Sequence, residues 1–132
     1  MTEIPGNDRA FILQAMVSVA ASDGDLHGDE LETISAIYVK ITGEKPGTDD
    51  IKSAHDHHRS QEITFADQLA SEHKQMSKEL KEAILSSAYM VLLADGRVAA
   101  RERKILMDFA KALKISEVHR SIIFEDVERA LD

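Results

Sequence analysis

The amino-acid sequence predicts an all-α fold, and two observations carry this prediction. Apolar residues recur at the spacing of an α-helix along almost the whole chain. No stretch shows the sustained alternation of apolar and polar residues that a half-buried strand requires. The chain has 132 residues, which is within the usual size of one domain, so we expect a single helical domain over residues 1–132.

The apolar spacing divides the chain into seven predicted helices. Two of them, at about residues 8–21 and 77–94, are apolar on most of their circumference and are therefore expected at the centre of the fold. Five more are expected around them, at about residues 29–42, 49–58, 64–71, 100–113 and 117–131. Gly43 is the expected left-handed cap of the 29–42 helix, and Thr64 and Ser77 are expected to begin the helices at their positions.

The outer helices carry apolar stripes that we expect to face the core. In the helix at residues 29–42 the stripe consists of Leu31, Ile34, Ile37, Tyr38 and Ile41. In the helix at residues 117–131 it consists of Val118, Ile122, Ile123 and Val127.

An internal repeat relates the two halves of the chain. At an offset of 72 residues, Asp23-Gly24 aligns with Asp95-Gly96, and Glu30 aligns with Glu102. The apolar positions of the helices on either side align as well. Residues 8–43 and 77–115 are therefore predicted to form two helical hairpins related by a pseudo-two-fold axis, with polar helices between them.

Each hairpin break has the pattern D-G-x-h-x-x-x-E, where h is an apolar residue. The second half of an EF-hand calcium loop has the same pattern, but the first two ligand positions of such a loop would fall on Val19 and Ala21 in the first copy. An ordinary EF-hand site is therefore excluded. The residue types favour a structural interpretation, in which the glycine ends one helix while Glu30 and Glu102 complement the start of the next.

A cation site is the second interpretation of these breaks. The first break carries the carboxylates of Asp23, Asp25, Asp29 and Glu30. A hard divalent cation such as Ca²⁺ is the only cofactor that this chemistry implies, because such ions bind oxygen ligands. In the second break, Asp95 and Glu102 would be neutralised by Arg97, Arg101 and Arg103. The first break is therefore the better place for an ion, unless the two breaks lie side by side.

A histidine run at residues 55–58 is another candidate for metal binding. His55 and His58 could share a helical face and bind Zn²⁺ or a similar ion, although a solvated polar helix explains the run equally well. A metal-dependent enzyme that combines these histidines with the acids is the alternative function. No phosphate-binding loop, nucleophile elbow or zinc-protease helix is present in the sequence, so we expect a protein that is not an enzyme.

The two hairpin segments, VSVAASDGDLHGDELETI and YMVLLADGRVAARERKIL, resemble the TerB-like tellurite-resistance family. The similarity covers residues 11–127. The family also includes the amino-terminal domain of a membrane-anchored J-domain co-chaperone, whose His-Pro-Asp motif is absent here. The resemblance implies an all-helical fold, a bacterial stress response, and divalent metal binding by the acids at the motif positions of Asp23, Glu30, Asp95 and Glu102. Arg97 and Arg101 depart from the family's more acidic pattern.

Composition narrows the classes of partner. The formal net charge is −8, which repels phosphate backbones and anionic lipids, so nucleic acid is not expected. The chain has no cysteine, which excludes thiol chemistry and makes direct reduction of tellurite improbable. The longest nearly apolar run, residues 11–21, is too short to span a bilayer. We expect a cytoplasmic adaptor or sensor that binds protein partners in a stress-response assembly, with a homodimer as a further option.

Overall fold

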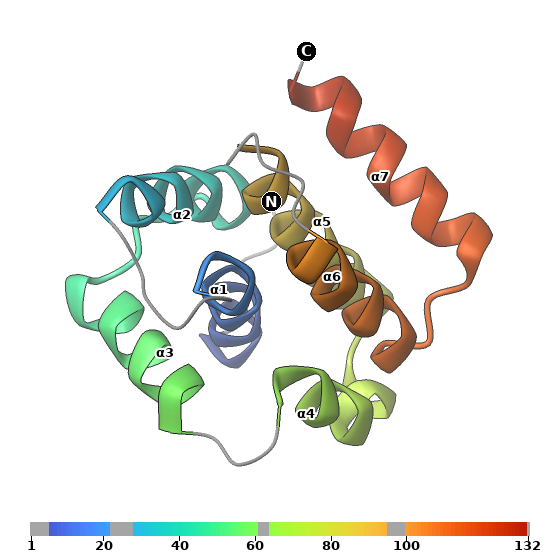
Figure 1. Cartoon of the computed structure of the whole chain (residues 1–132), viewed down its shortest axis with the longest axis horizontal. Coiled ribbons are helices and arrows are strands. Elements are labelled where there is room, and N and C mark those ends of the chain that lie inside the picture. The colour runs from blue at the N-terminus through green and yellow to red at the C-terminus, as the bar shows by residue number, and fades with distance from the viewer. Residues whose placement is uncertain (1–5, 22–27, 61–63, 95–99, 132) are drawn as a thin grey trace.

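The computed structural model describes residues 6–21, 28–60, 64–94 and 100–131. These residues form seven α-helices and one short 3-10 helix and contain no strand, which confirms the predicted fold class (Figure 1). The helices are α1 (Gly6–Ala20), α2 (Gly28–Thr42), α3 (Thr48–Ser60), α4 (Phe65–Glu72), η1 (His73–Gln75), α5 (Lys78–Ala94), α6 (Ala100–Ala112) and α7 (Glu117–Leu131). Their bounds lie within about two residues of those expected, and η1 is the one element that the apolar spacing does not predict.

Helices α1 and α5 form the centre of the fold, as their apolar circumference predicts. Figure 1 shows α1 with α2, α3, α4 and α6 around it. Every side chain from Ile12 to Val19 is buried, so no face of α1 is left to solvent over that stretch. The contact between α1 and α5 is the most extensive between any two described helices, and it joins the two halves of the chain into one core.

Helix α7 packs mainly on α5 and lies at the edge of the molecule (Figure 1). Ile123 and Val127 are buried in this contact, and the ring of Phe124 lies 4.3 Å from the ring of Tyr89, measured between centroids. The Tyr89 hydroxyl donates a hydrogen bond to Glu128 at 2.6 Å. Apolar packing and more than one polar contact, this hydrogen bond among them, therefore fix α7 on α5.

Three of the side chains that we expected to face the core are exposed. Val118 and Ile122 of α7 are 73% and 50% exposed, and Leu31 of α2 is 39% exposed. On α7, Ile123 and Val127 face α5. Ile122 is turned by about 100° around the helix axis from Ile123, and Val118, four residues before Ile122, lies on the same side as Ile122. The described part of the chain covers only one face of α7, so the inward prediction for Val118 and Ile122 is wrong, as it is for Leu31.

The helix ends confirm several predictions made from turn chemistry. The Thr64 hydroxyl accepts a hydrogen bond from the Asp67 amide at 3.1 Å, and the Ser77 hydroxyl accepts one from the Leu80 amide at 3.1 Å. Gly43 has φ +79°, the left-handed conformation expected of a C-terminal cap. Near the end of α6, Lys114 also has a positive φ, of 59°, although at the offset of 72 residues it aligns with Thr42 and not with Gly43.

The helix starts agree with the spacing of the repeat. Helices α1 and α5 begin at Gly6 and Lys78, and helices α2 and α6 begin at Gly28 and Ala100, so both pairs are offset by 72 residues. The hairpin breaks at residues 22–27 and 95–99 lie outside the described residues. The pseudo-two-fold axis accordingly stays a prediction.

Candidate functional site

A cavity of about 240 Å³ lies where the starts of α2 and α6 meet the ends of α1 and α5. It is lined by Ala20, Asp29, Glu30, Thr33, Val91, Ala94 and Glu102. Glu30 and Glu102 are the two glutamates that align in the repeat, and each lies in the first turn of its helix. The fold therefore brings the glutamates of both hairpins to the same cavity.

The local geometry accounts for the acids at this position. The first turn of a helix presents unpaired N–H groups and the positive end of the helix dipole, which favour a carboxylate. Glu30 and Glu102 are partly buried and take part in polar or electrostatic interactions within the fold, so neither is a free carboxylate. Asp29 lines the cavity with an exposed side chain, and its backbone carbonyl accepts a hydrogen bond from the Thr33 hydroxyl at 3.0 Å. Carboxylates at these positions can serve either to cap the helix starts or to bind a ligand.

Only part of the predicted cation site falls within the described residues. Asp29, Glu30 and Glu102 share the cavity, whereas Asp23, Asp25 and Asp95 lie outside the residues that the structure describes. Within the described ranges, no group of three or more His, Asp or Glu side chains is placed to hold a metal ion. The metal site therefore remains a prediction, and the structure adds that Glu30 and Glu102 lie on one cavity.

The histidines do not join these acids in the described part of the fold. His55 lies on α3 and lines neither this cavity nor the larger groove described below, and the side chain of His58 lies outside the described residues. His73 lies on η1, where partial burial and the positive charges of Lys81, Lys114 and Lys74 lower the pKa of its imidazole below 6.5. These lysines would also repel a cation bound to the His73 imidazole.

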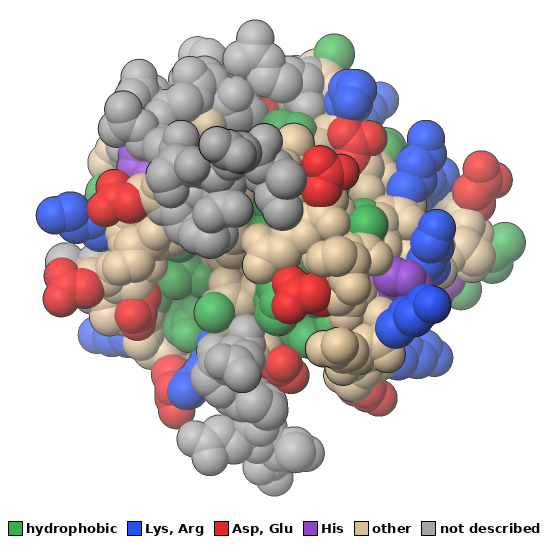
Figure 2. Space-filling view, turned by 90° about the horizontal axis from the view of Figure 1, so that it is seen from below, with side chains coloured by type: hydrophobic (Ala, Val, Ile, Leu, Met, Phe, Trp, Pro, Cys, Tyr) green, Lys and Arg blue, Asp and Glu red, His purple; other side chains and the backbone are tan. Residues whose placement is uncertain are grey.

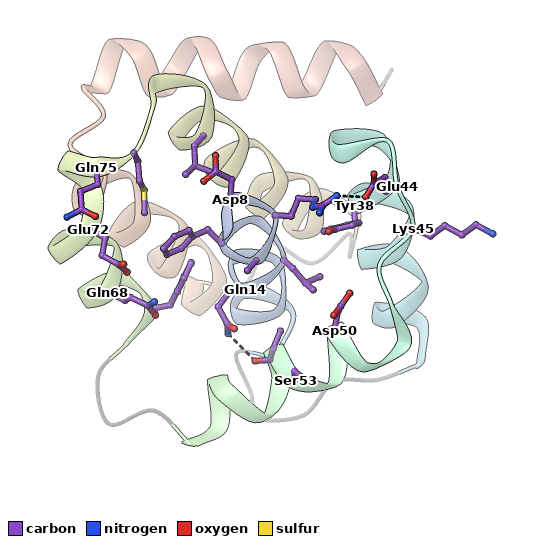
Figure 3. A pocket seen from close by; sticks show the side chains of 18 residues that line it. Asp8, Gln14, Tyr38, Glu44, Lys45, Asp50, Ser53, Gln68, Glu72 and Gln75 are labelled. Atoms are coloured by element: carbon purple, nitrogen blue, oxygen red, sulfur yellow. Dashed lines mark hydrogen bonds and ion pairs between the residues drawn. The ribbon is translucent and has the colours of Figure 1, made fainter. Parts of the chain in front are cut away.

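A second and larger feature is an open groove of about 940 Å³ along α1, bounded by α3 and the loop before it on one side and by α4 and η1 on the other (Figure 3). Its polar lining residues are Asp8, Arg9, Gln14, Tyr38, Glu44, Lys45, Asp50, Ser53, Gln68, Glu72 and Gln75. These residues come from segments far apart in the sequence. The groove is therefore a product of the tertiary fold.

At the α2–α3 end of the groove, polar groups pair with one another. Arg9 forms an ion pair with Glu44. The Asp50 carboxylate accepts a hydrogen bond from the Gly47 amide at 2.9 Å, which caps the start of α3. Burial raises the pKa of the Tyr38 hydroxyl; the nearby Arg9 opposes this shift, and the negative charges of Asp50 and Glu44 add to it.

The buried amide of Gln14 fixes α1 to α3. Its Nε2 atom donates a hydrogen bond to the Ala54 carbonyl at 3.1 Å, and its side chain is 8% exposed. In the sequence, Gln14 interrupts an otherwise apolar run, which is the one local signal that this part of α1 meets a polar neighbour. That signal does not indicate which residue the amide contacts.

The α4 end of the groove combines an apolar floor with carboxylates. The rings of Phe11 and Phe65 lie 6.4 Å apart between centroids, and Phe65 meets the buried Phe109 edge to face at 5.4 Å. Asp8 and Glu72 line this end and make no hydrogen bond or ion pair within the described part of the chain. This end of the groove therefore combines an aromatic floor with two carboxylates that have no partner among the described residues.

Comparison with known proteins identifies no similar protein. No family model, curated protein or solved structure matches the chain. No described helix is long and apolar enough to cross a membrane. The resemblance to the TerB-like family rests on the two repeated motifs and their spacing.

Proposed function

We propose that this chain is a non-enzymatic interaction domain of a TerB-like bacterial stress-response assembly, and that it binds a divalent cation at the cavity between α2 and α6. One observation carries the proposal: Glu30 and Glu102, which are 72 residues apart and equivalent in the repeat, line the same cavity. An ion held by both would connect the two halves of the domain. Cation binding would then change how firmly the hairpins are held together.

The composition of the cavity supports this proposal. Carboxylates enter it from the first turns of α2 and α6, and Ala20 and Ala94 mark the ends of α1 and α5 beside them. The last carbonyl groups of a helix have no partner within the helix, and they carry partial negative charge. Oxygen ligands of both kinds suit Ca²⁺ or a related hard cation, which takes about six to eight of them. The proposed ion would draw the remaining ligands from Asp23, Asp25, Asp95 or water.

Calorimetric and thermal-shift titrations with Ca²⁺, Mg²⁺, Mn²⁺ and Zn²⁺ test this site. One of these ions should raise the melting temperature of the wild-type protein, because a ligand at about 100 times its Kd stabilises the folded state by about 2.7 kcal/mol. Glu30→Gln and Glu102→Gln should each weaken the response, and the double variant should abolish it. A wild-type protein that responds to none of the four ions would contradict the proposal.

Two other glutamates supply matched controls. Glu79 and Glu117 lie in the first turns of α5 and α7 and do not line the cavity. Glu79→Gln and Glu117→Gln therefore remove the same charge from the same kind of helix position. They should leave the cation response unchanged, whereas an equal loss in all four variants would assign the effect to net charge.

The interaction role needs its own test. Purification of the full chain from a native lysate, with and without a chelator, should recover protein partners in a cation-dependent manner. A protein that binds the cation yet elutes as a monomer without partners under both conditions would retain the metal site and contradict the interaction role.

A further inference from the structure

The groove along α1 carries an excess of negative charge. Four carboxylates line it against two basic side chains, Arg9 and Lys45. Arg9 is already paired with Glu44, and Figure 3 shows the Lys45 side chain directed away from the groove. Asp8 and Glu72 are left without a cationic partner within the described residues. A ligand with positive charge would therefore complement the α4 end of the groove.

The same end has a firm apolar floor. Phe11, Phe65 and Met76 are half-buried there, and Phe65 rests against Phe109, which is 2% exposed. The ring contacts from Phe11 through Phe65 to Phe109 connect the groove to the core. An aromatic surface that is already ordered needs little further ordering when an apolar side chain binds to it. Met76 adds a flexible, polarisable side chain that adapts to different shapes.

From this arrangement we infer that the groove binds a basic amphipathic helix of a partner protein. One apolar side chain of the helix packs on Phe11, Phe65 and Met76, and lysine or arginine side chains of the next turn lie beside Asp8 and Glu72. The positive side chains of the bound helix also meet the aromatic faces of Phe11 and Phe65, and this cation–π contact adds to their attraction to the carboxylates.

The size and chemistry of the groove favour this occupant over others. A volume of about 940 Å³ lies at the upper end of the range for small-molecule pockets, which is about 300–1,000 Å³, and the groove is open to solvent. Its carboxylates repel nucleic acid and anionic lipid. An amphipathic helix offers apolar anchors and charges on adjacent positions, which matches a floor of Phe and Met flanked by acids.

The inference is independent of the cation site. The groove and the cavity between α2 and α6 share no lining residue. A chain that binds no cation could still bind the helix, and the reverse also holds, so the two proposals fail separately.

Two synthetic helical peptides with the same leucine positions provide the first test. One carries lysine at its polar positions and the other carries glutamate. We expect calorimetry to show that the lysine peptide binds to the full chain with an affinity that falls as salt is added. The peptide should also shift the amide resonances of Phe11, Gln68 and Met76. Equal binding of both peptides, or shifts confined to the exposed face of α7 at Val118 and Ile122, would overturn the inference.

Charge variants with a matched control provide the second test. Asp8→Asn combined with Glu72→Gln should weaken binding of the lysine peptide by about fivefold, since two unpaired rim charges each contribute modestly. Asp49→Asn combined with Asp56→Asn removes the same charge from exposed positions of α3 outside the groove lining and should change affinity by less than about twofold. Equal weakening in the two double variants would overturn the inference.

Two more variants test the floor and the competing occupant. Met76→Ala should weaken binding of the lysine peptide, and the loss should persist at high salt because the lost contact is apolar. The melting temperature should stay near that of the wild type, because Met76 is half-buried at the edge of the core. Wild-type affinity in Met76→Ala would contradict the proposed anchor. If the lysine peptide binds only to a chain that lacks residues 1–5, the chain's own N-terminal segment is the occupant and the partner proposal is overturned.

Discussion

The two inner helices, α1 and α5, are both largely buried but have different covers. Helix α3 covers α1 with two buried apolar side chains, Ile51 and Ala54. Helix α7 covers α5 with the buried Ile123 and Val127 and with the half-buried ring of Phe124, which stacks on Tyr89. Helix α3 therefore covers its inner helix with a smaller apolar surface than α7 does.

This difference places the groove beside the first hairpin. A polar cover helix with few apolar contacts leaves space along α1, and that space is lined by Gln14, Ser53 and Asp50. The groove therefore lies beside the inner helix whose cover brings the smaller apolar surface.

The largest effects should come from the shared centre. Ile12 and Ile84 align in the repeat, and both are fully buried. Ile12→Ala and Ile84→Ala should each lower the free energy of unfolding by about 2–5 kcal/mol, through lost apolar burial and the cavity left behind. Urea denaturation monitored by circular dichroism measures this loss. A cost below about 1 kcal/mol at one of the two positions would show that the inner helices are not equivalent.

Conservative variants provide the control for this pair. Ile12→Val and Ile84→Val remove one methylene group each, and they should cost about 0.5–1.5 kcal/mol. A valine variant as costly as the alanine variant would indicate rearranged packing in place of a simple cavity.

The hairpin ends should respond in opposite directions to substitution. Gly43→Ala introduces a side chain at φ +79° and should destabilise the protein by about 1–2 kcal/mol, although nothing lies within 4 Å of the added methyl group. Lys114→Gly relieves a left-handed lysine and should stabilise the protein by a few tenths to about 1 kcal/mol. Thermal unfolding of both variants measures the difference.

Gly28→Ala is the matched control for the hairpin ends. Gly28 begins α2 without a positive φ, and an added Cβ there meets nothing within 4 Å. It should therefore lie within about 0.5 kcal/mol of the wild type. A destabilisation equal to that of Gly43→Ala would rule out backbone strain as the cause.

Local chemistry made much of the fold predictable. Gly43, Thr64 and Ser77 were placed correctly because their caps depend on residues within one turn. Lys114 gave no comparable signal, because a lysine carries no preference for the left-handed region. Val118 and Ile122 were misplaced because helical spacing identifies an apolar side of a helix without showing which part of it a neighbour covers.

The candidate site was predictable only where the repeat marked it. The alignment of Glu30 with Glu102 identified two glutamates in advance, while their common cavity depends on how four helix ends converge. The groove had no such marker. Its lining runs from Asp8 to Leu80, and neither the pairing of Arg9 with Glu44 nor the position of Glu72 on the groove follows from neighbouring residues.

The smallest effect concerns the single tyrosine in each half of the molecule. Tyr38 lies on α2 and Tyr89 on α5, and the chain has no tryptophan, so tyrosinate absorbance reports on these two residues alone. Burial, followed by the hydrogen bond to Glu128, raises the pKa of Tyr89 from 10.0 to about 12. Burial also raises the pKa of Tyr38, but Arg9 partly opposes that shift. Tyr38 should therefore ionise before Tyr89.

Alkaline titration of Tyr38→Phe isolates Tyr89 and tests how α7 covers its helix. Absorbance should show one transition at about pH 12, and Glu128→Gln should move it down, because the neighbouring negative charge is removed. A hydroxyl with a raised pKa in the folded state stabilises the fold below its unfolded pKa of about 10, and this contribution disappears as the pH rises through the folded value. The stability of the wild type should accordingly fall between about pH 10 and 12, and Tyr89→Phe should flatten that fall. If Tyr89 titrates near 10 while circular dichroism shows intact helices, α7 does not hold the ring as the structure shows, and the second inner helix is no better covered than the first.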